Sequence, residues 1–207
     1  GRRTFNKIAL GSIPFFLKSN LALSNNHTYK IHRGSISGIN NDNISDKITD
    51  ELTVEENNTI LQANNSILLL QKNTKIKHSG NLSFDLIQGA VHAVFNQDSS
   101  SKLVSTPTGV LAIRGTGIYC ETLEDATYVC CCYGGAYIKN TDHTKNINTS
   151  YHVPTMMPKS GQFYDAPFDR PLNHFDNHLV HLEKIAGRKP HWNLPNGEML
   201  FSDGVEL

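Results

Sequence analysis

The sequence predicts a mainly β domain followed by a tail that carries one helix. Residues 29–97 contain short apolar runs with no helical period, which is typical of strands. Asn, Gly, Ser and Asp interrupt these runs roughly every eight to twelve residues, the spacing of turns in sandwiches, barrels and rolls. Residues 173–187 are the one segment that combines apolar side chains at helical spacing with signals for a helix end.

Residues 1–24 have the features of an export signal. Arg2-Arg3-Thr4-Phe5-Asn6-Lys7 resembles the twin-arginine motif, in which paired arginines precede a Phe and a Lys, with Asn6 in place of the usual leucine. Residues 8–17 form a diluted apolar run, shorter than the roughly 20 residues that span a bilayer, and Ala22-Leu23-Ser24 fits a cleavage site. An ordinary amphipathic segment is the alternative. The prediction is a periplasmic protein whose signal is removed and whose mature chain has no transmembrane segment.

Strands are expected from residue 29 to about residue 140. Residues 66–70 form a continuous apolar run, as in a buried strand. Apolar residues alternate along residues 82–86 and again along residues 91–95, as on a strand with one buried face. Gly89 separates these two segments and fits a bulge or a corner of the sheet.

The middle of the chain combines turn signals with strand signals. Pro107 suits a tight turn, because proline fixes φ. An apolar, β-prone run follows, and Gly115 and Gly117 interrupt it with flexible backbone. Two short strands at residues 118–120 and 127–130 then flank a polar link, so a hairpin is predicted.

Side chains alternate between the two faces of a strand. One face of the second hairpin strand would therefore carry Tyr128, Cys130 and Cys132. The other face would carry Val129, Cys131 and Tyr133. Two thiols side by side on one rigid face are the strongest candidate in this sequence for a chemical function.

These segments resemble the FecR-like domain, a periplasmic all-β module. The resemblance is carried by Thr106-Pro107-Thr108, by Ile113-Arg114-Gly115-Thr116-Gly117 and by Tyr128-Val129-Cys130-Cys131-Cys132-Tyr133-Gly134. The Cys-x-Cys-Tyr-Gly part resembles a narrower, exported bacterial subgroup, as do residues 173–190. The resemblance implies a short β-solenoid or β-roll over residues 29–140. The composition changes after Ile138 and predicts an irregular tail over residues 141–207, with the helix at about 173–187. The structural turn residues would be Pro107, Gly115, Gly117 and Gly134.

The helix of residues 173–187 is expected to pack on the β domain. Three residues at helical spacing would dock it: Leu179, Leu182 and Ala186. Asn173 or Asp176 would cap its start, and Gly187 would end it. Three histidines fall near one face, which we interpret as solvated in preference to metal-binding: His174, His178 and His181.

Cys130 and Cys132 allow three interpretations. Thiolates suit zinc, copper or an iron–sulfur centre, and this pair would need further ligands, of which His152 is the first choice and His174 the second. The pair could instead be a disulfide or redox pair. Cys120 is then the better bridge partner for either thiol, because Cα atoms at i and i+2 of a strand lie about 6.5–7 Å apart. Unreactive, packed thiols are the third interpretation.

Arg114 and Tyr128 are the candidate binding residues. The Arg114 guanidinium would hold a carboxylate or a phosphate, although hydrogen bonds to loop carbonyls are the favoured interpretation of this arginine. Tyr128 shares the predicted face of the thiols. Residues 151–154 are expected to pack across that face, with His152 as the nearest imidazole.

Composition and motifs limit the possible functions. The 19 basic and 19 acidic residues balance, which argues against nucleic acid as the partner. The sequence contains no nucleophile elbow, P-loop or HExxH motif. A non-enzymatic protein is therefore predicted.

The resemblance to the FecR-like domain implies a binding or signalling role. Known relatives include regulators that take a signal from an outer-membrane transporter to a sigma factor. This chain is expected to be an exported, soluble module that binds a protein partner in the periplasm. The alternative is a metal-binding or thiol-redox protein that uses Cys130, Cys132 and His152. Twin-arginine export carries folded proteins, commonly with a cofactor, so a metal would be acquired where the thiols are still reduced.

Overall fold

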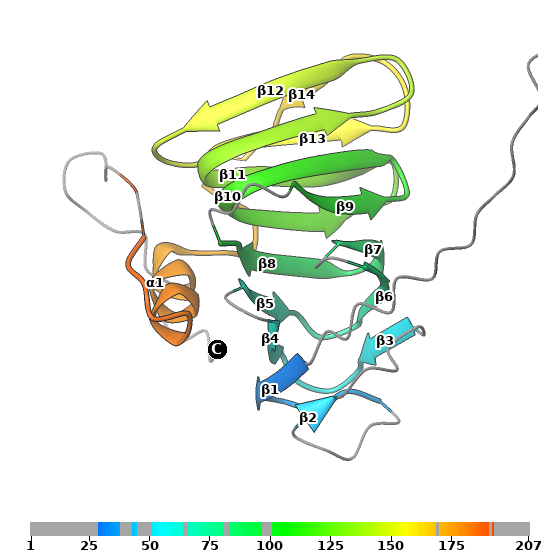
Figure 1. The fold of residues 1–207 in the computed structure, drawn as a ribbon. Helices are drawn as coiled ribbons and strands as arrows, with labels where there is room; N and C mark the ends of the chain where they lie inside the picture. Colours follow the sequence, from blue (N-terminus) through cyan, green and yellow to red (C-terminus); the bar gives the residue numbers. More distant parts are fainter. Residues whose placement is uncertain are drawn as a thin grey trace, which may run out of the picture.

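The computed structural model describes residues 29–37, 43–44, 51–63, 66–80, 83–96, 101–168, 170–190 and 192. The expected export signal of residues 1–24 lies outside these residues. Within them, 14 strands form one hydrogen-bonded sheet, and a single helix packs against it (Figure 1). The predicted mainly β class with one helix is confirmed.

The elements follow the chain in this order: β1 (Tyr29–Arg33), β2 (Asn43–Ile44), β3 (Glu51–Val54), β4 (Thr59–Ala63), β5 (Ser66–Leu70), β6 (Thr74–Gly80), β7 (Ser83–Gln88), β8 (Ala90–Val94), β9 (Lys102–Thr106), β10 (Gly109–Thr122), β11 (Ala126–Lys139), β12 (Thr144–Thr149), β13 (Val153–Pro158), β14 (Tyr164–Asp165) and α1 (Asp176–Ile185). The predicted hairpin is the pair β10 and β11, which are the longest strands and lie at the centre of the sheet.

The sheet is curled, open and mostly antiparallel. Its hydrogen-bonded order is β2-β1-β4-β5-β8-β10-β9-β7-β6-β3, and β11 joins β10 to β12 and to β13. Every pair among the described strands is antiparallel except β7 with β9. Figure 1 shows the strands in successive layers as the sheet curls. In a β-helical solenoid, the strands of successive turns pair in parallel. The antiparallel strand pairs of this sheet therefore differ from those of a parallel solenoid.

The sheet separates two apolar cores. The helix-side core includes Ile67, Leu69, Tyr119, Tyr128, Cys130, Cys132, Leu179 and Leu182. The opposite core includes Leu68, Leu70, Ile113, Ile118, Cys120, Val129 and Cys131. Neighbouring residues of a strand enter different cores because side chains alternate. The apolar run of residues 66–70 forms β5 and is buried along its whole length, since both of its faces are covered.

A bulge in β11 changes this alternation at the thiols. Cys131 lies opposite Ile118 and Tyr133 lies opposite Gly117, so Cys132 has no partner on β10. An extra residue in one strand moves the following side chains to the other face. Tyr133 therefore lies in the helix-side core together with Cys132. The prediction that Tyr133 shares the face of Cys131 is wrong for this reason.

The predicted turn residues shape the hairpins on either side of β10. Pro107 lies in the two-residue turn between β9 and β10, where the Thr106 hydroxyl accepts a hydrogen bond from the backbone N–H of Gly109 at 3.2 Å. Gly115 and Gly134 have φ angles of 49° and 85°, which glycine adopts without a steric penalty. Both glycines lie where the register of β10 and β11 shifts.

Gly117 provides space for a neighbouring ring. A Cβ added at this position would lie 2.5 Å from Cε1 of Tyr133 and 3.0 Å from Cδ2 of Leu179. Because the Tyr133 ring is buried between the sheet and α1, Gly117→Ala is expected to lower the free energy of unfolding by about 1–3 kcal/mol. Urea denaturation would measure this loss.

Gly135→Ala is the matched control for that prediction. The nearest atom to a Cβ added there is the carbonyl oxygen of Ile147, at 3.9 Å. The control should keep the free energy of unfolding within about 0.5 kcal/mol of the wild type. Equal stability of the Gly117→Ala and wild-type proteins would show that the site is not crowded.

The sheet continues beyond residue 140. Asn140 begins a turn in which its Oδ1 accepts hydrogen bonds from the backbone N–H groups of Asp142 and His143, at 3.0 and 2.8 Å. β12 then returns along one half of β11, and β13 pairs with the other half. The prediction of an irregular tail from residue 141 is therefore wrong for residues 144–149, 153–158 and 164–165, which form strands. β12 was not recognisable as a strand because its only buried residue is Ile147.

The start of α1 differs from the prediction. The helix begins at Asp176 and not at residue 173, and its N-cap residue, Phe175, makes no side-chain hydrogen bond to the helix. Asn173 has a φ angle of 52° and donates its side-chain amide to the Glu121 carboxylate at 3.0 and 3.1 Å. The predicted caps Asn173 and Asp176 are therefore wrong, because both side chains bind partners outside the helix.

The end of α1 is the predicted one. Gly187 has a φ angle of 73° and donates its N–H to the carbonyl of Lys184 at 3.1 Å. The N–H of Arg188 donates to the carbonyl of Glu183 at 2.8 Å. Together these bonds form a Schellman motif. Among the described residues, no helix has the length and apolar character that crossing a bilayer requires.

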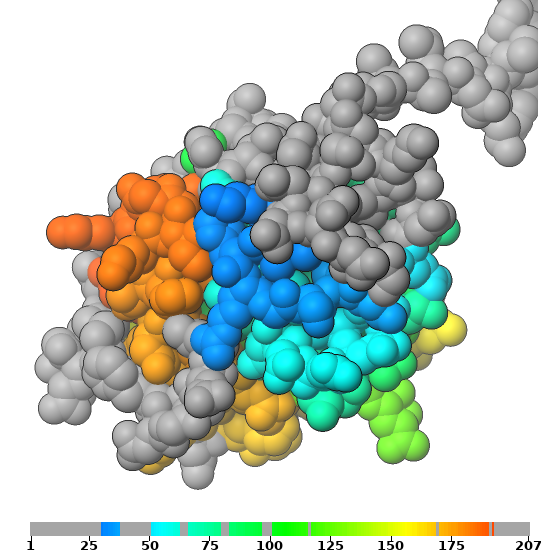
Figure 2. All heavy atoms as spheres, turned by 90° about the horizontal axis from the view of Figure 1, so that it is seen from below, coloured from blue at the N-terminus to red at the C-terminus, as the bar shows by residue number. Residues whose placement is uncertain are grey.

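α1 packs through the residues predicted for this role. Leu179 and Leu182 are fully buried, and Ala186 packs partly buried against the same core. The helix contacts β5 and β8, and Figure 2 shows its surface beside that of β1. His174 and His178 are buried too. The interpretation of the histidine face as solvated is therefore wrong for His174 and His178, which the sheet covers, whereas His181 is half-buried.

Candidate metal centre

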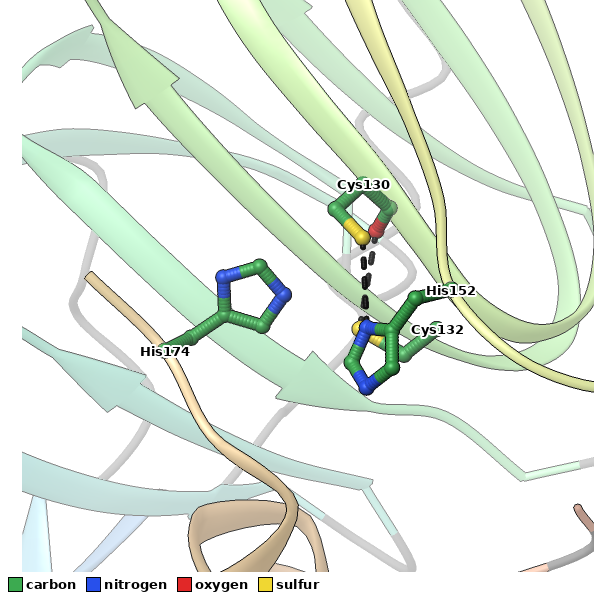
Figure 3. A group of neighbouring side chains, drawn as sticks. All are labelled: Cys130, Cys132, His152 and His174. Carbon is green, nitrogen blue, oxygen red and sulfur yellow. Dashed lines mark hydrogen bonds between the residues drawn. The ribbon is translucent and has the colours of Figure 1, made fainter. Parts of the chain in front are cut away.

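Four side chains from three segments meet in and beside the helix-side core. Cys130 and Cys132 belong to β11, His152 directly precedes β13, and His174 lies shortly before α1. One ligand atom from each side chain lies within 4.8 Å of the other three, and Figure 3 shows how the side chains converge. Both cysteines and His174 are fully buried, and the side chain of His152 is 4% exposed.

Strand pairing brings His152 to the thiols. β13 runs antiparallel beside β11, with Pro154 opposite Cys130. His152 Nδ1 lies 3.3 Å from Cys130 Sγ. The imidazole that the sequence analysis expected beside the thiols therefore contacts one of them. The segment of residues 151–154 does not cross the thiol face, however. It lies alongside β11 because its backbone completes the sheet.

Contacts with the sheet hold the segment that carries His174. The Tyr128 hydroxyl accepts a hydrogen bond from the N–H of Leu172 at 3.1 Å, and the Gln71 amide donates to the carbonyl of Asn173 at 2.9 Å. The His174 ring stacks on the ring of Tyr119, with centroids 4.3 Å apart. The imidazole is thus positioned by the fold itself.

Hydrogen bonding decides which nitrogen of His174 is available. Nδ1 lies 2.7 Å from the carbonyl oxygen of Leu172, and since a carbonyl can only accept, Nδ1 carries the proton. Nε2 is buried and has no hydrogen-bond partner among the described residues. An unsatisfied buried acceptor costs about 1–3 kcal/mol. A metal ion at Nε2 would remove that cost.

The nitrogens of His152 have the opposite arrangement. Nε2 lies 2.8 Å from Oδ1 of Asp176, and a carboxylate can only accept, so Nε2 carries the proton. Nδ1 faces Cys130 Sγ. Oδ2 of Asp176 accepts a hydrogen bond from the Tyr151 hydroxyl at 2.6 Å. Metal-bound histidines commonly donate their second N–H to a carboxylate in this way.

In the metal-free site the pKa values of the two thiols are shifted in opposite directions. Burial acts to raise the pKa of Cys130, but its hydrogen bond to Cys132 and the neighbouring imidazoles of His174 and His152 lower that pKa well below its usual value. Burial and the bond to Cys130 raise the pKa of Cys132 well above its usual value. Burial lowers the pKa of His152, but hydrogen bonds to Asp176 and Cys130 outweigh it and raise that pKa to about 9. An ion would therefore displace protons from Cys132 and His152.

His92 belongs to the same cluster and was not predicted. It is fully buried on β8, its Nε2 lies 3.8 Å from Cys132 Sγ, and its ring lies 5.1 Å from that of His174. Burial and the charges of His174 and His178 lower its pKa well below the usual value. The sequence signal that could have found it is a histidine inside the run of residues 90–94, all of which are buried.

The other two cysteines lie apart from this site. Cys120 and Cys131 are buried in the opposite core, on the far side of the sheet from Cys130 and Cys132. Alternation along β10 and β11 separates the two pairs. The prediction that Cys120 is the better bridge partner of Cys130 or Cys132 is therefore wrong.

The arrangement has the elements of nucleophilic catalysis as well as of metal binding. Cys130, His152 and Asp176 are hydrogen-bonded in the order of a thiol nucleophile, its base and the group that orients the base. A nucleophile must reach its substrate, whereas the Cys130 side chain is fully buried. Burial is no obstacle for a single ion that binds as the protein folds. Metal binding is therefore the chemistry that suits this site.

The distances favour one ion. The ligand atoms of a tetrahedral ion, with Zn–S near 2.3 Å and Zn–N near 2.0 Å, lie about 3.3–3.8 Å from one another. The four atoms here lie within 4.8 Å, so small side-chain movements would complete the geometry. Two thiolates with two imidazoles form a familiar ligand set for zinc. An iron–sulfur cluster places several atoms between its protein ligands and needs a wider site.

The two candidate binding residues have different surroundings. Tyr128 is fully buried, and its hydroxyl accepts a hydrogen bond from the N–H of Leu172, so its prediction as a binding residue is wrong. Arg114 is exposed and lines an open hollow of about 480 Å³ together with Tyr137 and Asn148. Its binding role stays a prediction.

Comparisons with known proteins give no family. No family model matches the chain, and no curated protein matches it. Two crystal structures of a proposed anti-sigma factor from Parabacteroides distasonis are similar to it. One has a TM-score of 0.48 at 9% identity, and the other has a TM-score of 0.47 at 10% identity. Each match covers 56% of this chain and 59% of the other. A likeness of this size supports neither a family nor a function.

Proposed function

We propose that this protein binds one zinc ion through Cys130, Cys132, His152 and His174. The observation that carries the proposal is the mutual approach of four ligand atoms within 4.8 Å, three of them on fully buried residues and the fourth on the His152 side chain, which is 4% exposed. The unpartnered Nε2 of His174 supports it, as does the hydrogen bond that leaves Nδ1 of His152 facing a thiol.

The role of the ion would be structural. Four protein ligands leave no open position for a substrate, which distinguishes structural from catalytic zinc sites. The ligands come from β11, from the residue directly before β13 and from the segment that leads into α1. One ion would therefore join the C-terminal helix to the sheet.

Elemental analysis of the purified protein tests this proposal. One zinc per chain is expected, and copper in place of zinc would keep the centre but change the assigned ion, since copper(I) also prefers thiolates. Less than about 0.1 equivalents of any metal, together with thiols that react freely after unfolding, would contradict a metal-bound native state.

We also propose that the β-sheet is a FecR-like roll that acts in the periplasm as a binding or signalling module. The resemblance of its turn residues supports this role. A row of side chains on β9, β10 and β11 supports a partner surface. Leu103 lies opposite Ala112, and Ala112 lies opposite Tyr137. Leu103 and Tyr137 are 46% and 40% exposed.

Affinity capture from a periplasmic extract tests the partner surface. The wild-type protein is expected to recover a specific partner, and a Leu103→Ser, Tyr137→Ser double variant is expected to lose it, because exposed aromatic and aliphatic side chains anchor interfaces. A partner retained equally by the double variant would place the interface elsewhere. No specific partner with either protein would count against the binding role.

Export is tested separately at the N-terminus. Replacement of Arg2 and Arg3 by lysine is expected to leave the precursor in the cytoplasm, because the paired arginines are the part of the signal that resembles the twin-arginine motif. Immunoblots of cytoplasmic and periplasmic fractions would measure this. Unchanged export of the double-lysine variant would mean that another route is used.

A further inference from the structure

We propose that Asp176 is a positioning residue of the metal centre, which makes His152 bind the ion through Nδ1 and not through Nε2. The inference rests on the proposed zinc site and adds a residue outside the ligand set. It also specifies that the two histidine ligands use different ring nitrogens.

The geometry around Asp176 carries this inference. Its side chain is 0% exposed, that of His152 is 4% exposed, and Oδ1 lies 2.8 Å from Nε2 of His152. A neutral imidazole that is protonated at Nε2 has its lone pair at Nδ1. Nδ1 is the atom that lies 3.3 Å from Cys130 Sγ. The carboxylate thus selects the tautomer that presents a donor atom to the thiols.

Asp176 is itself held in place. Its second oxygen, Oδ2, accepts a hydrogen bond from the Tyr151 hydroxyl at 2.6 Å. It is also the acidic residue in the first turn of α1, where the helix dipole favours a negative charge. Because both of its oxygens have partners, the carboxylate cannot turn away from His152 without breaking a second hydrogen bond.

His174 provides the contrast within the same site. Its Nδ1 donates to the carbonyl of Leu172 at 2.7 Å, so its Nε2 is the available nitrogen. A backbone carbonyl therefore orients one imidazole, and a carboxylate orients the other. Loss of such a supporting partner typically lowers metal affinity 10–100-fold.

Zinc affinity of an Asp176→Asn variant tests the inference, measured by competition with a coloured chelator. The variant removes the charge at nearly constant volume, and 10–100-fold weaker zinc binding is expected. The matched control is Glu183→Gln. Glu183 is a second buried carboxylate of α1, and it accepts a hydrogen bond from the Tyr133 hydroxyl and pairs with Arg188.

The two variants separate positioning from helix docking. Glu183→Gln should bind zinc within about 3-fold of the wild type, because the Glu183 carboxylate binds Tyr133 and Arg188, neither of which is a ligand. Equal losses in both variants would mean that Asp176 acts only by docking α1, which overturns the inference. Wild-type affinity in Asp176→Asn would overturn it as well.

Nitrogen NMR of the zinc-loaded wild-type protein gives a test that needs no variant. The expected spectrum shows His152 with a retained Nε2–H and a coordinated Nδ1, and His174 with the reverse. Coordination of His152 through Nε2 would overturn the inference while leaving the zinc site intact. A wild-type protein that binds no zinc would instead remove the proposed function.

Discussion

Replacement of Cys132 by alanine is expected to remove zinc from the protein and to lower its melting temperature by about 8–16 °C. The variant loses one of two thiolate ligands, and the remaining set cannot close a tetrahedral site. At a zinc concentration 1,000 times the Kd, binding stabilises a fold by about 4 kcal/mol. Each kcal/mol corresponds to about 2–4 °C for a domain of roughly this size. Elemental analysis and thermal denaturation with and without a chelator measure both effects.

Cys131→Ala is the matched control for this experiment. Cys131 is the neighbouring residue on β11, but its side chain is buried in the opposite core. Its loss should cost some stability through the smaller core side chain and leave the zinc content at one per chain. The chelator-sensitive part of the melting temperature should persist in Cys131→Ala and be absent from Cys132→Ala. Full zinc content in Cys132→Ala would contradict its assignment as a ligand.

The metal-free protein is expected to lose on the order of 2 kcal/mol of stability between pH 7 and pH 5 because His178 is buried. Burial, followed by the charges of His174 and His181, lowers the pKa of His178 from 6.5 to about 4. The unfolded chain takes up this proton below pH 6.5, whereas the folded chain does not. A depressed folded-state pKa therefore contributes stability above pH 6.5 that is lost as the pH falls towards 4. At pH 5, which is 1.5 units below 6.5, the free energy of unfolding has fallen by about 1.36 kcal/mol for each of these units.

Urea denaturation at pH 7 and at pH 5, after treatment with a chelator, checks this prediction. A His178→Leu variant should lose less stability than the wild type over this range, because the group that must stay neutral is gone. His32→Leu, at an exposed position on β1, should keep the wild-type dependence. Identical pH dependence in wild type and His178→Leu would contradict the prediction. The zinc-loaded protein should show a steeper acid loss, since protons compete with the ion for its ligands.

The local patterns of the sequence predicted much of the sheet and the end of the helix. The apolar run of residues 66–70 predicts a buried strand, and these residues form β5. Gly187 predicts the end of a helix, and it follows α1 with a positive φ angle. The helical spacing of Leu179 and Leu182 predicts that they dock the helix, and both are fully buried. Each of these predictions depends on side-chain spacing or backbone preference within a few residues, which a short window of sequence contains.

The polar strands and the supporting residues of the centre escaped prediction. β12 lies at the edge of the sheet and buries so little apolar surface that its residues resemble a loop. His92 and Asp176 have no motif of their own. They are recognisable only when β8 and α1 are placed against β11, so that His92 meets Cys132 and Asp176 meets His152.

The sequence by itself determined the strand-rich class, the central hairpin with its turns, the helix, and the types of ligand available. These follow from local preferences: alternation, proline and glycine geometry, and the affinity of thiols and imidazoles for metals. Only the tertiary structure decided where the ligands meet and which atoms they present. The bulge at Cys132, the pairing of β13 with β11, and the hydrogen bond from His152 to Asp176 set that geometry. These contacts join residues far apart in the chain, and the spacing of side chains along one segment does not encode the register between segments.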